Sequence, residues 1–150
     1  MQPPASDNPI QREVESGVLA FRREGIQEGV HLARIAIRPG ETSTPHYHPA
    51  TRDIFYVMAG TLTITVEVPA AEGGVPPYDS LAAAAPEIVR TATGHEIHTI
   101  RLHPGEILAV NPPAVHCTSN AGDGPCSFLC IEGIGEYRFV PARLDQTLAR

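Results

Sequence analysis

Two histidines, His46 and His48, lie one residue apart in the segment HYHPATRD, which also contains Asp53. On an extended strand, side chains two residues apart point to the same face, so both imidazoles can reach one metal ion. Asp53 can add an oxygen ligand from the beginning of the following apolar run. His116 supplies a remote nitrogen ligand, because it opens a distant segment, HCTSN. These four residues predict a site for a divalent metal ion.

The four other histidines have simpler interpretations. His31 shares one face of an alternating strand with apolar residues, and we expect it to be a hydrogen-bonded core residue. His95 and His98 flank a hairpin expected around Gly94, and His103 precedes a Pro-Gly turn. We therefore expect surface or structural roles for these three residues.

The surroundings of the predicted site are mostly apolar. By strand alternation, Phe55 and Val57 face inward on one ligand-bearing strand, and Thr118 and Asn120 do so on the other. An apolar cavity with few polar groups is typical of a small-molecule site. Arg52 lies beside the site, where we expect a solvated side chain, with the binding of an anionic substrate as the alternative.

Composition excludes several classes of function. All 11 basic residues are arginine, so no lysine is present to form a Schiff base or bind a phosphate. A formal net charge of −6 argues against a nucleic-acid partner. The cysteines form no C-x-x-C pair, and we expect Cys117, Cys126 and Cys130 to be buried small hydrophobes. No secretory signal or membrane-spanning run of about 18 apolar residues is visible, which favours a cytoplasmic protein.

The elements that must position the site are short strands. The 150 residues suit a single domain, 1–150, and the 13 glycines and 15 prolines suit many turns. Period-two alternation predicts roughly nine to eleven strands, almost no helix, and an antiparallel sandwich or barrel. A Pro/Gly/Ala-rich insertion at 69–86, with one helical turn expected near Ser80, is either a mobile lid or a subunit contact.

At the predicted metal site the sequence resembles the cupin family. The first cupin motif, G-x5-H-x-H-x3–4-E-x6-G, is matched in spacing over residues 40–60, with Asp53 in place of glutamate. The second, G-x5-P-x-G-x2-H-x3-N, is matched over residues 105–120, with Asn-Pro-Pro at 111–113 in place of Pro-x-Gly. The resemblance covers about residues 30–140 and implies an all-β, antiparallel barrel of the jelly-roll type.

The resemblance also implies a ligand set of His46, His48, Asp53 and His116 for Fe, Zn, Mn or Ni. It further implies a homodimer, with the N-terminal strand expected to cross to the partner. Because aspartate is one methylene shorter than glutamate, we expect its carboxylate to fall about 1.5 Å short unless the backbone moves. Asp53 then binds the metal directly, acts through a water, or lies next to a site of three histidine ligands. A catalytic base is the alternative role for this residue.

Three functions fit these expectations. The leading one is a metal-dependent enzyme that acts on a small organic molecule by oxygenase-type chemistry, with Fe(II) binding dioxygen and substrate together, as in dioxygenases. The first alternative is a cyclase or isomerase, similar to cupins of aromatic-polyketide pathways, which uses the ion as a Lewis acid. The second alternative is a non-catalytic protein that binds a small ligand.

Overall fold

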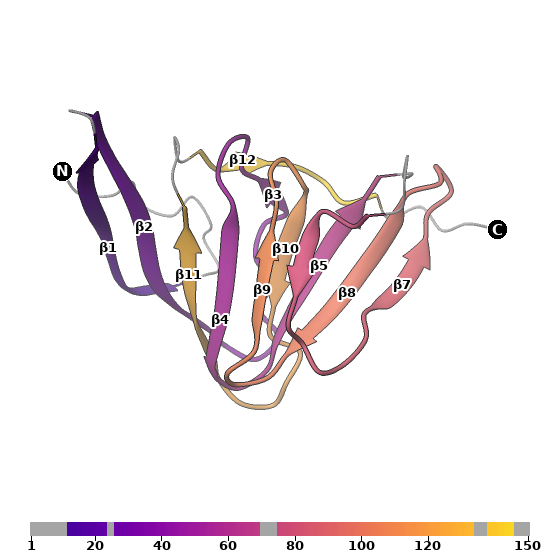
Figure 1. Cartoon of the computed structure of the whole chain (residues 1–150). Coiled ribbons are helices and arrows are strands. Elements are labelled where there is room, and N and C mark those ends of the chain that lie inside the picture. The colour runs from indigo at the N-terminus through magenta and orange to yellow at the C-terminus, as the bar shows by residue number, and fades with distance from the viewer. Residues whose placement is uncertain (1–11, 24–25, 70–74, 134–137, 146–150) are drawn as a thin grey trace.

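The computed structural model describes residues 12–23, 26–69, 75–133 and 138–145, with side chains from Leu32 onward. These residues form no helix and twelve strands, arranged in two antiparallel six-stranded sheets. The prediction of an all-β, antiparallel jelly roll is confirmed. Figure 1 shows the two sheets packed against each other around a common interior.

The chain passes repeatedly from one sheet to the other, as it does in jelly rolls. The first sheet contains, in spatial order, β1 (Arg12–Arg23), β2 (Ile26–Ile37), β11 (Cys126–Glu132), β4 (Asp53–Ala59), β9 (Ile107–Val110) and β6 (Tyr78–Ser80). The second contains β12 (Val140–Pro141), β3 (His46–Tyr47), β10 (His116–Ser119), β5 (Leu62–Val68), β8 (Glu96–Leu102) and β7 (Glu87–Arg90).

The apolar core follows from strand alternation. On β5, the sequence LTITVEV buries Ile64 and Val66 completely. On β4, Phe55 and Val57 are buried while Tyr56 is 36% exposed, so the predicted inward face of this strand is confirmed. Burial of these side chains contributes roughly 1.5–3 kcal/mol each relative to exposure. This core holds the strands whose ends carry the predicted ligands.

A glycine closes the hairpin between β4 and β5. Gly60 has φ +74°, and a Cβ atom there would lie 2.4 Å from the carbonyl oxygen of Pro125 and 2.9 Å from Cα of Cys126. Only glycine fits so close to another backbone at this φ. The last glycine of the first motif therefore has a packing reason, since it lets the β4–β5 turn contact the segment that enters β11.

One prediction about the insertion is wrong. Ser80 lies in strand β6 rather than in a helical turn, because Tyr78 is buried and pairs with Val110 of β9. Residues 70–74 of the insertion lie outside the described residues. The N-terminal strand β1 pairs with β2 of its own chain over its length, and its expected crossing to a partner stays a prediction. Within the described chain there is also no helix long and apolar enough to cross a membrane.

Candidate metal centre

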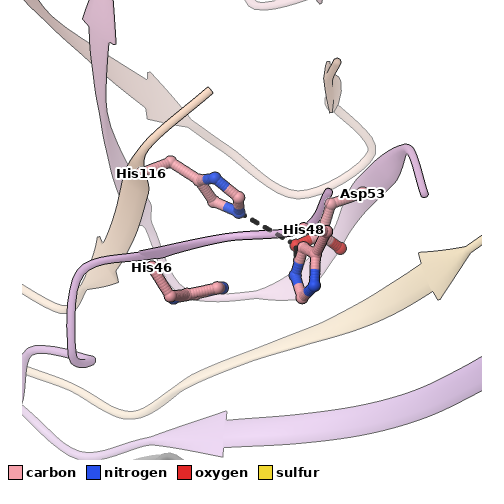
Figure 2. Close-up of side chains that lie close together, drawn as sticks. All are labelled: His46, His48, Asp53 and His116. Carbon is pink, nitrogen blue, oxygen red and sulfur yellow. Dashed lines mark hydrogen bonds and ion pairs between the residues drawn. The ribbon is translucent and has the colours of Figure 1, made fainter. Parts of the chain in front are cut away.

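The four predicted ligands converge from three segments of the barrel. His46 lies on β3 and His48 just beyond it, whereas Asp53 begins β4 and His116 begins β10. Antiparallel pairing puts His116 directly opposite His46. One nitrogen or oxygen atom of each residue lies within 4.8 Å of those of the others. Figure 2 shows the four side chains pointing toward one another, and each is at most 5% exposed.

Main-chain carbonyl groups fix the orientation of all three imidazoles. Nδ1 of His46 lies 2.8 Å from the oxygen of Thr44, and Nδ1 of His116 lies 2.9 Å from that of Ala114. Nδ1 of His48 lies 2.7 Å from the oxygen of Arg138. A carbonyl oxygen only accepts, so each Nδ1 carries a proton, and Nε2 is the atom available to a metal. Three Nε2 atoms and one carboxylate therefore fit a divalent transition-metal ion.

Asp53 reaches the imidazoles in spite of its short side chain. Its Oδ2 lies 3.0 Å from Nε2 of His116 and 3.2 Å from Nε2 of His48. The carboxylate of Asp53, at the start of β4, therefore reaches two of the histidines without an added methylene. The carboxylate is thus in position to share a metal ion with them.

Burial and mutual contact set the charges of the metal-free site. Burial, together with the neighbouring His116, lowers the pKa of His46 to about 3. Burial acts in the same direction on His48, but its hydrogen bond to Asp53 and the charge of that carboxylate raise its pKa to about 9. Although burial opposes ionisation of Asp53, its contacts with the imidazoles of His116 and His48 hold its pKa far below the usual range. The site therefore holds an anionic Asp53 beside a protonated His48.

Two neighbours on β11 were not among the predicted site residues. Cys130 donates its S–H to Oδ1 of Asp53, with 2.8 Å between sulfur and oxygen. Glu132 is buried, and its Oε2 lies 4.0 Å from Nδ1 of His48. All three cysteines are free and buried, as predicted, but Cys130 is more than a small hydrophobe. Alternation along β11 puts Cys130 and Glu132 on the inner face, whereas their position beside Asp53 depends on the pairing of distant strands.

The other residues expected around the site are placed as follows. Phe55 packs near His116, with 6.0 Å between ring centroids. Thr118 and Asn120 are buried, but the amide of Asn120 donates to the carbonyl oxygens of Ile37 and Gly124 and so stabilises a loop. Arg52 is exposed and forms an ion pair with Asp79, in line with the expected solvated side chain.

The remaining histidines have contacts outside the predicted ligand set. His98 is buried between the two sheets, where Nδ1 lies 2.6 Å from the hydroxyl oxygen of Tyr78. His95 contacts Glu67, and His103 contacts Glu106 near the surface. The side chain of His31 is outside the described part of the chain.

Comparison with known proteins gives one family. The family model described as Cupin matches residues 24–134, which include all four predicted ligands. Germin-like protein 1-1 of Oryza sativa subsp. japonica is 26% identical over 101 residues, 67% of this chain and 36% of that protein. The chain is also 26% identical to Germin-like protein subfamily 2 member 1 of Arabidopsis thaliana over 101 residues, which are 67% of this chain and 35% of that protein. The chain thus spans about a third of the length of these curated relatives.

Solved structures share the fold. A recombinant oxalate oxidase in complex with glycolate matches with a TM-score of 0.55 and 18% identity, over 83% of this chain and 54% of that one. Oxalate decarboxylase from Bacillus subtilis at pH 4.6 matches with a TM-score of 0.53 and 21% identity, over 87% of this chain and 29% of that one. Another structure of the Bacillus subtilis enzyme is described as having Mn(II) centers. It matches with a TM-score of 0.52 and 21% identity, over 81% of this chain and 29% of that one.

Proposed function

The chain belongs to the cupin family, and from this premise we propose that it is a metal-dependent enzyme acting on a small organic molecule by oxygenase-type chemistry. One observation carries the proposal: three imidazoles and one carboxylate converge within 4.8 Å inside an apolar barrel. We propose His46, His48, Asp53 and His116 as the ligands of a divalent ion.

Charge indicates the class of substrate. Three neutral imidazoles and one carboxylate leave a divalent ion with a net charge of about +1. Such a centre favours a small molecule that offers an anionic oxygen, for example a carboxylate or an enolate. Bound Fe or Mn would supply redox chemistry and activate dioxygen toward the adjacent substrate. The structural neighbours described as oxalate oxidase and oxalate decarboxylase support a small organic acid as the substrate.

The surrounding residues orient the ligands. Carbonyl groups hold each Nε2 toward the centre, and Cys130 holds one oxygen of Asp53. Since Oδ2 faces the imidazoles and Oδ1 accepts from Cys130, neither oxygen is placed to take a proton from a substrate. We therefore propose direct ligation for Asp53 in preference to the role of a catalytic base.

Metal-dependent oxygen uptake tests the proposal. The protein is reconstituted separately with Fe(II), Mn(II) and Zn(II), and oxygen consumption is followed with oxalate, glycolate, a catechol and a 1,3-diketone. We expect uptake with Fe or Mn and a substrate together, none with Zn, and none in the His46→Ala/His48→Ala variant. Conversion of oxalate without net oxygen uptake would indicate decarboxylation, and such conversion of the 1,3-diketone would indicate Lewis-acid cyclase or isomerase chemistry instead. Metal binding without any conversion would favour the non-catalytic alternative.

The homodimer and the cytoplasmic location both remain predictions. Sedimentation at micromolar concentration tests the first, and fractionation of the source cells tests the second.

A further inference from the structure

A segment after β11, residues 138–145, lies directly beside the histidine ligands and is called the strap here. In β12, Val140 and Pro141 pair with Tyr47 and His46 of β3. The next amide, that of Ala142, donates to the oxygen of Pro45 across 2.9 Å. In Figure 1 the strap is the yellow segment that contains β12 and runs along the rim of the barrel. It therefore follows the strand that carries two of the four ligands.

The beginning of the strap contacts both of those ligands. The ring of Phe139 stacks on the imidazole of His46, with 4.1 Å between centroids and 20° between planes. The same ring meets His48 edge-on, with centroids 6.2 Å apart. The carbonyl oxygen of Arg138 accepts the Nδ1 proton of His48 across 2.7 Å. Two imidazoles thus obtain part of their orientation from the strap, whereas His116 obtains its own from Ala114.

The end of the strap is held on the barrel by a clasp, defined here as Glu67, Thr93, His95 and Asp145. Thr93 donates its hydroxyl proton to the carboxylate of Asp145. The backbone amide of Asp145 donates to Oε1 of Glu67, which lies 3.3 Å away. Nδ1 of His95 lies 3.2 Å from the same oxygen. Polar contacts from β5 and from the segment before β8 therefore hold the strap down.

Burial of the ligands gives this arrangement a functional consequence. His46 is 5% exposed and His48 is 2% exposed, so no substrate reaches the centre unless something that covers it moves. Phe139 is the described side chain that stacks on a ligand from outside the core strands. The strap is short, and Phe139 lies six residues from the clasp residue Asp145. Such short, rim-bound segments open at lower free energy than core strands.

We propose that the strap is a gate over the metal centre and that its opening also releases the orientation of His46 and His48. The inference rests on the proposed metal site and adds Phe139, Arg138 and the clasp to it as positioning residues. When the strap lifts, the stack on His46 and the carbonyl partner of His48 are lost together. Entry to the site and tight metal binding are therefore coupled: the closed form holds the ion, and the open form admits a ligand and loosens the ion.

The first test measures how fast the metal leaves. The protein is loaded with Co(II), excess EDTA is added, and loss of the visible Co(II) absorption is followed. Partners that orient a metal ligand contribute about 10–100-fold to metal affinity. We expect Phe139→Ala and Asp145→Ala to speed release by about that factor. Phe139→Leu and Asp145→Asn, which retain an apolar contact and an acceptor, should restore slower release.

Asp123→Ala is the matched control, because Asp123 is an exposed acid in the loop between β10 and β11. It should release Co(II) at the rate of the unmodified protein. The proposal is overturned if Phe139→Ala and Asp145→Ala both release Co(II) at that rate as well.

The second test needs no metal and so separates this proposal from the proposed function. Hydrogen exchange of the metal-free protein reports how often the Ala142 amide opens, because this amide donates a hydrogen bond to the oxygen of Pro45 in the closed strap. Asp145→Ala should speed exchange at residues 138–145 and leave β5 and β10 unchanged. Equally faster exchange throughout the barrel would indicate general destabilisation. Unchanged exchange in the strap would show that the clasp does not hold it. Either result overturns the proposed gate. If the protein binds no Co(II) but shows this selective exchange, the result supports the gate and contradicts the proposed function.

Discussion

The thiol of Cys130 on β11 donates a hydrogen bond to Oδ1 of Asp53 on β4, with 2.8 Å between the two atoms. Both side chains are buried. Because one carboxylate oxygen is occupied in this way, the other oxygen, Oδ2, faces the imidazoles of His48 and His116. A cysteine that looks like a core residue in the sequence thus orients the only carboxylate in the proposed ligand set.

Replacing Cys130 should weaken metal binding. We expect Cys130→Ala to lower the affinity for Mn(II) or Co(II) by about 10–100-fold, since the carboxylate loses the donor that orients it. Cys130→Ser retains a donor and should stay close to the unmodified protein. Cys126→Ala, which removes another buried thiol of β11, is the control and should lower stability without lowering affinity. Isothermal titration calorimetry measures the affinities, and unchanged affinity in Cys130→Ala would contradict the assignment.

Removing two imidazoles should abolish stoichiometric metal binding. His46→Ala/His48→Ala leaves a single imidazole and Asp53 at the site, while the core side chains of β4 and β5 remain in place. We expect a folded, metal-free protein by elemental analysis and circular dichroism. Unchanged metal content would show that the ligands lie elsewhere, and unfolding after metal removal would show that the ion is structural.

Asp53 gives a test of direct ligation. Asp53→Asn removes the only anionic ligand of the proposed set, and we expect a loss of affinity beyond the roughly 100-fold that outer partners contribute. Asp53→Glu adds a methylene at a buried position where the carboxylate already reaches both imidazoles. We expect overpacking of about 1–3 kcal/mol and no gain in affinity. Full affinity with lost activity in Asp53→Asn would instead make this residue a proton acceptor.

Metal affinity should rise with pH. A metal ion needs the unprotonated Nε2 of His48, whose pKa in the metal-free protein is about 9. Binding therefore releases one proton below that pH, so the apparent affinity should increase by about tenfold per pH unit and level off near pH 9. Titrations between pH 6.5 and 9.5 in two buffers with different ionisation enthalpies measure both the slope and the proton release. A flat profile would contradict the protonated state assigned to His48.

Stability of the metal-free protein should change in the opposite direction. The pKa of His48 is raised from 6.5 to about 9 on folding, so its contact with Asp53 contributes fully below the unfolded pKa and is lost as the pH rises through about 9. The melting temperature of the metal-free protein should fall over this range. His48→Gln, which cannot hold the proton, is the control and should remove this component.

Gly60→Ala should destabilise the barrel more than Gly40→Ala. Both glycines have positive φ, at +74° and +81°, but only the Cβ at position 60 would meet another backbone, 2.4 Å from the oxygen of Pro125. Strain at positive φ costs about 1–3 kcal/mol at either position, and the clash adds to it at position 60. Urea unfolding of the two variants separates the contributions, and equal losses would mean that the backbone near Pro125 yields easily.

Strand alternation predicted the inner face of the barrel correctly. The buried side chains of β4 and the common direction of His46 and His48 follow from a two-residue period, which is a local property of the chain. The two motifs gave the spacing of the ligands along the sequence. Neither required knowledge of which strands pair.

The features that the sequence did not predict depend on contacts between distant segments. The local composition around Tyr78 indicated a loop, but the pairing of Tyr78 with Val110 of β9 makes this segment strand β6. Cys130 lies near Asp53 because Glu132, two residues further along β11, pairs with Asp53 of β4. The position of Phe139 over His46 likewise follows from pairing between β12 and β3. Register of this kind is not encoded in the period of a single strand.

The hydrogen bonds at Nδ1 of the three imidazoles all end on main-chain oxygens, those of Thr44, Ala114 and Arg138. Every amino acid supplies the same oxygen, so these three hydrogen bonds do not depend on which side chain stands at positions 44, 114 and 138. The orientation of the ligands is therefore robust to drift in the neighbouring sequence. The hydrogen bonds depend on the path of the backbone at these positions. Insertions and deletions nearby should therefore disturb the site more than substitutions do.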